Sequence, residues 1–220
     1  MVAHDRQWCY IHIPKCGGIS VTRAWLAQME KKDKYFVFNH RNWQTGLNAE
    51  FIQEGKRPAS KGSVFNNIHA TYDQLALQYP DYKYYTVIRN PLTRWESLYR
   101  HNCDHGFIVD WDIITWTKKA IKSLENGAYF GTIQNLDLFE KSLVRMGSYH
   151  VMYLPAWVYY REPEVEVHRL EDHTIWKALG VMRNNHHKAI TQLAGYDTER
   201  VREMIYNYYK KDFERWQMTE

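Results

Sequence analysis

Hydrophobic and polar positions follow two different periods along this chain of 220 residues. Short runs of β-branched and aromatic residues, bounded by Pro or Gly, predict buried strands, whereas apolar residues three or four apart predict helices. Strands are expected at 9–13, 35–38, 63–68, 84–88, 149–154 and 164–170. Helices are expected from Ser20, at 70–79, from Pro91, at 107–124, 136–146 and 171–179, and from Asp197 to the end. The length suits one domain with a sizeable core.

The stretch from Trp8 to Trp25, WCYIHIPKCGGISVTRAW, joins a predicted strand to a predicted helix. Pro14 cannot donate to a sheet ladder and should end the strand, and the Gly-Gly pair that follows permits a tight turn. Backbone N–H groups converge at such a helix start, where the helix dipole favours an anion, and Lys15 adds a positive charge. The alternative is an ordinary strand-to-helix turn with a surface lysine.

A second motif lies at Tyr84–Arg100, YYTVIRNPLTRWESLYR. Arg89 falls at the end of the predicted strand, and Asn90 followed by Pro91 predicts a helix start. Ser97 then lies about two helical turns further on, since a turn takes about 3.6 residues. An arginine at a strand end suits phosphate binding. The alternative is that this arginine pairs with surface carboxylates.

The two motifs together resemble a known family. IHIPKCGGIS resembles the 5′-phosphosulfate loop of sulfotransferases that use 3′-phosphoadenylyl sulfate (PAPS), and VIRNPLTRWESLY resembles their 3′-phosphate motif. The resemblance is closest to the carbohydrate-type, Golgi-type branch and its soluble microbial or viral relatives. It implies an α/β fold of the P-loop-like, three-layer kind, with a central, mainly parallel sheet flanked by helices. It also implies that residues 1–220 form a single sulfotransferase domain, and that the enzyme releases PAP and needs no metal.

The same resemblance assigns roles to individual residues. The 5′-phosphosulfate end of the donor falls to Lys15, Cys16, Gly17, Gly18, Ile19 and Ser20. The 3′-phosphate falls to Arg89 and Ser97, and a late basic loop contributes Arg183 and Lys188, for which a plain solvated loop is equally open. Relatives often carry threonine where this chain has Cys16 and Ile19, so we expect weaker or altered donor contacts there. A reactive thiol at Cys16 ranks low, because no His–Asp relay adjoins it in the sequence.

His69 follows the predicted strand at 63–68 and precedes a predicted helix. Open α/β sheets bind ligands at the carboxyl ends of their strands. The resemblance makes this histidine the general base, a role that a neutral imidazole suits near pH 7. The alternative is a histidine that only caps the helix. The long polar stretch at 39–62 either forms a wall of the acceptor site or is a plain surface loop.

Composition limits the partners. The net charge of +4 suits an anionic nucleotide, but no run of Lys and Arg indicates a nucleic-acid surface. The three cysteines lack the spacing of a zinc site or a disulfide framework. No apolar leader or membrane-length segment is found, so we expect a cytoplasmic protein that acts on a small-molecule or glycan acceptor. The oligomeric state is left open.

The predicted reaction is transfer of a sulfo group from PAPS to a hydroxyl by in-line displacement, with His69 as base and Lys15 stabilising the leaving group. The acceptor is not identified, and a carbohydrate is one candidate. One alternative is a P-loop kinase or NTPase, but that motif places its lysine after the glycines. The other alternative is a non-catalytic module that binds a nucleotide or glycan.

Overall fold

A computed structural model describes residues 1–28, 35–36, 69, 71–77, 79–104, 106, 108, 110–125, 152–182 and 195–218. The chain divides into two compact units. The first unit comprises Met1–Ile88 and Ala156–His187, and the second comprises Arg89–Pro155 and Lys188–Glu220. The prediction that one sulfotransferase domain spans the chain stays a prediction.

A mixed sheet forms the centre of the first unit. Within the described residues its strand order is β3-β1-β2-β4-β5, made of β1 (Val2–Ala3), β2 (Trp8–Ile11), β3 (Tyr35–Phe36), β4 (Lys83–Ile88) and β5 (Val165–Arg169). The strands β2, β4 and β5 run parallel, whereas β1 pairs antiparallel with both β2 and β3. The three parallel strands are those that the sequence predicted around its two motifs and its late strand.

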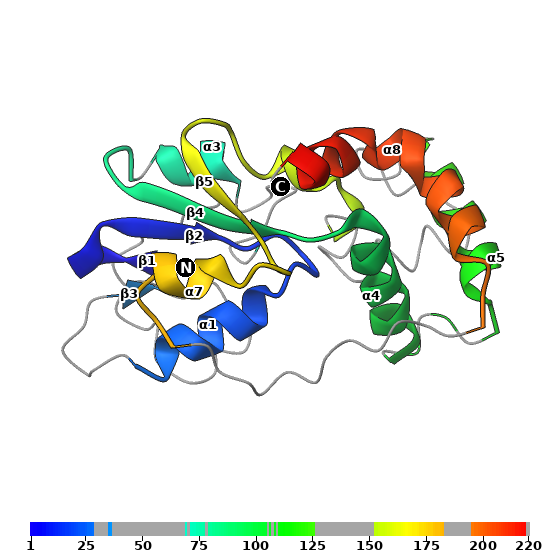
Figure 1. The fold of residues 1–220 in the computed structure, drawn as a ribbon, viewed down its shortest axis with the longest axis horizontal. Coiled ribbons are helices and arrows are strands. Elements are labelled where there is room, and N and C mark those ends of the chain that lie inside the picture. Colours follow the sequence, from blue (N-terminus) through cyan, green and yellow to red (C-terminus); the bar gives the residue numbers. More distant parts are fainter. Residues whose placement is uncertain are drawn as a thin grey trace, which may run out of the picture. The chain divides into compact units, whose positions relative to one another are not determined.

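Helices cover both faces of this sheet. Alternation along β2 places Trp8 and Tyr10 on one face, where they form a buried cluster with residues of α1 (Gly18–Leu26) and α7 (Thr174–Ala178). On the other face, Tyr84 of β4 meets Tyr72 of α3 (Tyr72–Ala76) edge to face, with 4.9 Å between ring centroids. Two short 3₁₀ turns, η1 (His4–Arg6) and η5 (Ala156–Val158), complete the described elements of the unit. The predicted three-layer α/β fold is confirmed (Figure 1).

The second unit is helical in its described part. The helices α4 (Pro91–Asp104), α5 (Ile113–Glu125) and α8 (Thr198–Met218) share one buried apolar core, to which Trp95, Trp116 and Tyr209 contribute. Asn90 caps α4 through its side-chain oxygen, which accepts from the N–H of Leu92 at 3.0 Å. α8 departs from helical geometry at Tyr209, where it is kinked. In Figure 1, α8 is the helix coloured from orange to red.

Element boundaries differ from the predicted ones where a cap or a very short strand decides them. The helix predicted at 107–124 begins at Ile113, because the Asp112 carboxylate caps it by accepting from the Thr115 N–H at 2.8 Å. The strand β1 was not predicted, since two residues are too few to show alternation. Met152 and Tyr153, at the end of a predicted strand, lie in a 3₁₀ turn instead. The predicted elements at 63–68 and 136–146 and the loop at 39–62 lie outside the described residues.

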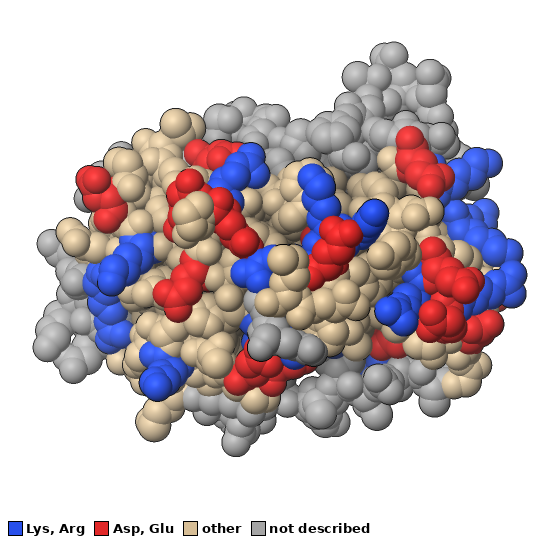
Figure 2. Space-filling view, turned by 45° about the horizontal axis from the view of Figure 1, so that its top comes forward, with Lys and Arg blue, Asp and Glu red and all other residues tan. Residues whose placement is uncertain are grey.

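None of the helices in the described part of the chain combines the length and the apolar character that crossing a membrane requires. Figure 2 shows Lys and Arg interspersed with Asp and Glu over the described residues of the visible face.

Candidate active site

The turn between β2 and α1 carries the first predicted motif. After β2 ends at Ile11, the chain passes through Pro14 to Lys15, which adopts a left-handed conformation with φ 64°. Gly17 adopts φ 80° and directly precedes the first residue of α1. These two residues with positive φ, only two positions apart, make the connection from β2 to α1 a tight turn. The predicted strand, glycine turn and helix start are therefore confirmed.

Gly17 is fixed by its neighbours as well as by its conformation. Its carbonyl accepts hydrogen bonds from the N–H groups of Ser20 at 2.9 Å and Val21 at 3.2 Å. A Cβ atom built on Gly17 would lie 2.6 Å from Cδ1 of Leu170, at the end of β5. The positive φ favours glycine here, and a larger residue would also force the Leu170 side chain to shift. Leu170, which directly follows β5, thus packs against the turn that follows β2.

Gly18 is glycine for a different reason. A Cβ atom at this position would lie 2.0 Å from Cδ2 and 2.3 Å from Nε2 of the His12 imidazole. The imidazole therefore occupies the space that any larger residue would need at the start of α1. His12 itself directly follows β2 and is partly buried.

His69 contacts His12 through both its ring and a hydrogen bond. Its Nδ1 is 3.0 Å from the carbonyl oxygen of His12, and the two imidazole rings meet edge to face with 5.1 Å between centroids. A carbonyl oxygen only accepts, so this hydrogen bond requires the proton of a neutral His69 to sit on Nδ1. The basic lone pair of the ring is then on Nε2. Only 5% of the residue is exposed, which holds the ring in a defined orientation.

The surroundings of His12 disfavour its protonated form. Burial lowers the pKa of the His12 imidazole well below its usual 6.5, and the nearby charges of His69, the N-terminal amino group and Lys15 lower this pKa further. Lys15 therefore lies close enough to act on the His12 imidazole. The first unit brings together Lys15, the Gly17–Gly18 turn and His69, three parts of the site that the sequence predicted separately.

The sequence analysis did not single out His12 as a site residue. A signal was present, because His12 is a polar residue at the carboxyl end of a buried strand, where α/β sheets place their ligand sites. The same criterion selected His69 and Arg89. The contact between His12 and His69 could not be predicted from the sequence, because the two residues are 57 positions apart.

The two positions at which relatives often have threonine differ in their exposure to solvent. The Cys16 side chain is fully buried, so its thiol is not presented to solvent. Ile19, by contrast, is 54% exposed on the first turn of α1, and Ser20 beside it is partly buried. The first turn of α1 therefore lacks a hydroxyl group at Ile19 and retains one at Ser20.

The second motif opens the second unit. Arg89 is largely buried, and its Nε donates to the Thr93 hydroxyl at 3.0 Å, which orients the guanidinium. Ser97 lies on α4 and is partly buried. The structure thus confirms the strand end and the helix that carry these two residues, and their contact with a phosphate stays a prediction.

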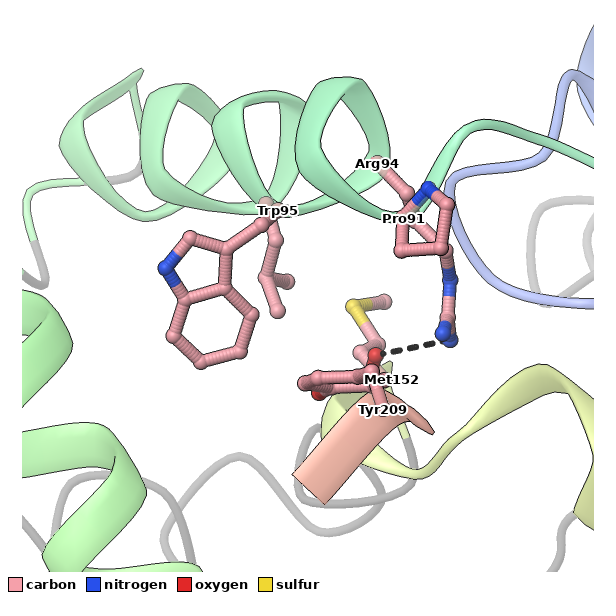
Figure 3. Close-up of a pocket in the computed structure, with 6 residues that line it drawn as sticks. Pro91, Arg94, Trp95, Met152 and Tyr209 are labelled. Atoms are coloured by element: carbon pink, nitrogen blue, oxygen red, sulfur yellow. Dashed lines mark hydrogen bonds between the residues drawn. The ribbon is translucent and has the colours of Figure 1, made fainter. Parts of the chain in front are cut away.

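Arg94, on the same helix, has a structural role. Its guanidinium donates to the carbonyl oxygens of Met152 at 3.2 Å and Leu154 at 2.8 Å, and forms an ion pair with Asp212 at 3.7 Å. Figure 3 shows Arg94 directed toward Met152 and Tyr209 across a small pocket. Pro91, Trp95 and Leu98 complete the lining of this pocket, which leaves no room for a water molecule. The pocket is therefore part of the core of the second unit.

Two predicted site residues, Arg183 and Lys188, lie outside the described residues. Within the described part of the chain, His, Cys, Asp and Glu side chains form no group of three that could hold a metal ion.

Comparisons with known proteins bear on the family. A family model described as "Sulfotransferase family" matches residues 1–122, which include both motifs and His69. A search of curated proteins found no match. Among solved structures, a sulfotransferase from Alicyclobacillus acidocaldarius is similar, with 13% identity, a TM-score of 0.39, and coverage of 98% of this chain and 88% of that chain. Because the family model matches more than half of the 220 residues, this chain belongs to the sulfotransferase family.

Proposed function

We propose that this protein transfers a sulfo group from PAPS to a hydroxyl group of an acceptor, with a carbohydrate as one candidate class. Membership of the sulfotransferase family supports the reaction class and disfavours a kinase or NTPase. The observation that carries the proposal is the position of His69, whose ring contacts the residue that also packs against the start of α1. A base beside an anion-binding turn is what transfer of a sulfo group to a hydroxyl requires.

The proposed site for the 5′-phosphosulfate is the turn at the start of α1. The first N–H groups of a helix have no acceptor within the helix, and here they belong to Gly18 and Ile19. Together with the helix dipole and the Lys15 ammonium they favour a bound anion. The residues present therefore fit the phosphosulfate end of the donor, with one hydroxyl fewer at Ile19 than relatives that have threonine there.

The proposed mechanism assigns one task to each residue. The donor supplies the sulfo group, whose bond to the 5′-phosphate oxygen breaks while the acceptor oxygen bonds to sulfur. Nε2 of His69 takes the proton of the acceptor hydroxyl as that oxygen attacks. Lys15 and the N–H groups of the turn stabilise the negative charge that builds on the departing phosphate oxygen.

The 3′-phosphate is assigned to Arg89 and Ser97 on the resemblance of their motif, and the oriented guanidinium of Arg89 supports that assignment. The carbohydrate-type branch, the contribution of Arg183 and Lys188 and a cytoplasmic location rest on the sequence alone.

A transfer assay with radiolabelled PAPS and a panel of glycans and phenols tests the proposal. Wild-type protein should label at least one acceptor, and His69→Asn should lower that rate by about 10²- to 10⁴-fold, the usual span for a general base. The matched control is His173→Asn, since His173 is exposed and asparagine tolerates its positive φ. Full activity of His69→Asn, with the control also fully active, would remove the general base from the proposal.

Nucleotide binding separates the alternatives. Calorimetric titration should show tight binding of PAP and weaker binding of ATP, both independent of Mg²⁺. Arg89→Ala should weaken PAP binding but leave binding of a nucleotide without the 3′-phosphate unchanged, and Lys118→Ala, on an exposed position of α5, serves as the charge-matched control. Binding of ATP that requires Mg²⁺ would favour a kinase. Binding of PAP with no turnover on any acceptor would favour a non-catalytic module.

A further inference from the structure

The His12 imidazole adjoins two parts of the proposed site, the start of α1 and His69. Its Cδ2 and Nε2 atoms lie 2.0 and 2.3 Å from where a Cβ on Gly18 would be. The same ring packs edge to face on the His69 ring, at an interplanar angle of 66°. Its backbone carbonyl also accepts the hydrogen bond from Nδ1 of His69. A single residue thus contacts both the start of α1 and the histidine assigned as base.

We propose that His12 is a positioning residue: its imidazole, held against Gly18, keeps the His69 ring oriented with Nδ1–H on the His12 carbonyl and Nε2 as the proton acceptor. This inference rests on the proposed function for its catalytic meaning, but the orientation of His69 that it explains is a property of the protein without donor or acceptor.

Two observations support a positioning role over a second acid–base role. The Nε2 atom of His12 faces the Gly18 backbone, so a substrate hydroxyl has no access to it from that side. Burial, and then the charges of His69, the N-terminal amino group and Lys15, depress the pKa of His12. A ring that stays neutral at working pH places no repelling charge beside a His69 that must accept a proton.

The tautomer of His69 gives a direct readout. In ¹⁵N-detected NMR of the full chain, wild-type His69 should show the pattern of a neutral ring protonated on Nδ1. His12→Ala removes the ring but keeps the carbonyl, so we expect His69 to become a mixture of both tautomers. His12→Phe restores a planar ring that does not titrate, and should return His69 to the wild-type tautomer. Loss of fold alone would not produce this difference, because His12→Ala and His12→Phe are compared in folded protein.

His4→Ala is the matched control, because the His4 ring also packs edge to face on neighbouring rings of the same unit, those of Tyr79 and Tyr82. It should leave the tautomer of His69 unchanged. In the transfer assay, His12→Ala should lower kcat by about 10- to 100-fold with the donor KM nearly unchanged, since misplacing a catalytic group by about 1 Å costs about 10²-fold. An unchanged His69 tautomer in His12→Ala would overturn the positioning role, whether or not the protein is active. Absence of transfer by the wild type would contradict the proposed function and leave the tautomer result to decide the role of His12.

Discussion

The contact between Gly18 and His12 makes a quantitative prediction about stability. Gly18→Ala places a methyl group where the His12 ring lies, 2.0 Å from its Cδ2. Forcing a methyl group into a filled space costs about 1–3 kcal/mol. Gly18 has a helical conformation at the first position of α1, so without the ring alanine should be neutral or up to about 1 kcal/mol more stable than glycine.

A double-mutant cycle isolates this contact. Thermal unfolding of wild type, Gly18→Ala, His12→Ala and the double variant should give a coupling energy of about 1–3 kcal/mol, with Gly18→Ala destabilising wild type and not destabilising His12→Ala. For a chain of this size each kcal/mol shifts Tm by about 2–4 °C. The same cycle with His4→Ala in place of His12→Ala should be additive. Equal destabilisation by Gly18→Ala in the wild-type and His12→Ala backgrounds would refute the placement of the His12 ring.

Three further predictions follow from burial and charge. In the unfolded chain His12 binds a proton near pH 6.5, whereas in the folded chain its pKa is lower. The free energy of unfolding should therefore decrease as the pH falls below 6.5. In urea titrations, His12→Phe should weaken this pH dependence. Native protein should react with a thiol reagent fast at Cys103 only, because Cys16 and Cys9 are buried; fast labelling that survives Cys103→Ser would contradict this. Arg94→Met removes the guanidinium from the buried ion pair with Asp212 and should cost about 3–5 kcal/mol, partly recovered by adding Asp212→Leu. No loss of stability on urea unfolding would contradict a stabilising role for this pair.

The sequence predicted the features that local chemistry determines. Pro14 and the glycines end one strand and start α1, and Asn90 with Pro91 starts α4, because capping and backbone freedom act within a few residues. The roles of Lys15, His69 and Arg89 came from motifs, and the structure confirms the elements that carry Lys15 and Arg89.

Long-range contacts could not be predicted in the same way. Gly17 and Gly18 are adjacent, yet one packs against Leu170 and the other against His12, and no periodicity in the sequence predicts either contact. Arg94 shares a helix with Ser97, and only the structure shows that its charge is directed to Asp212 and two carbonyl oxygens. Tertiary packing decides such roles, so equal residue types in one motif can have different functions.

The central claim is that the turn before α1 binds the phosphate end of the donor beside His69. A crystal structure of the protein with PAP tests it most directly. We expect the 5′-phosphate oxygens within hydrogen-bonding distance, about 3 Å, of Lys15 Nζ and of the N–H groups of Gly18 and Ile19, with Nε2 of His69 facing the same phosphate. PAP bound elsewhere, with that turn contacting no phosphate, would contradict the claim.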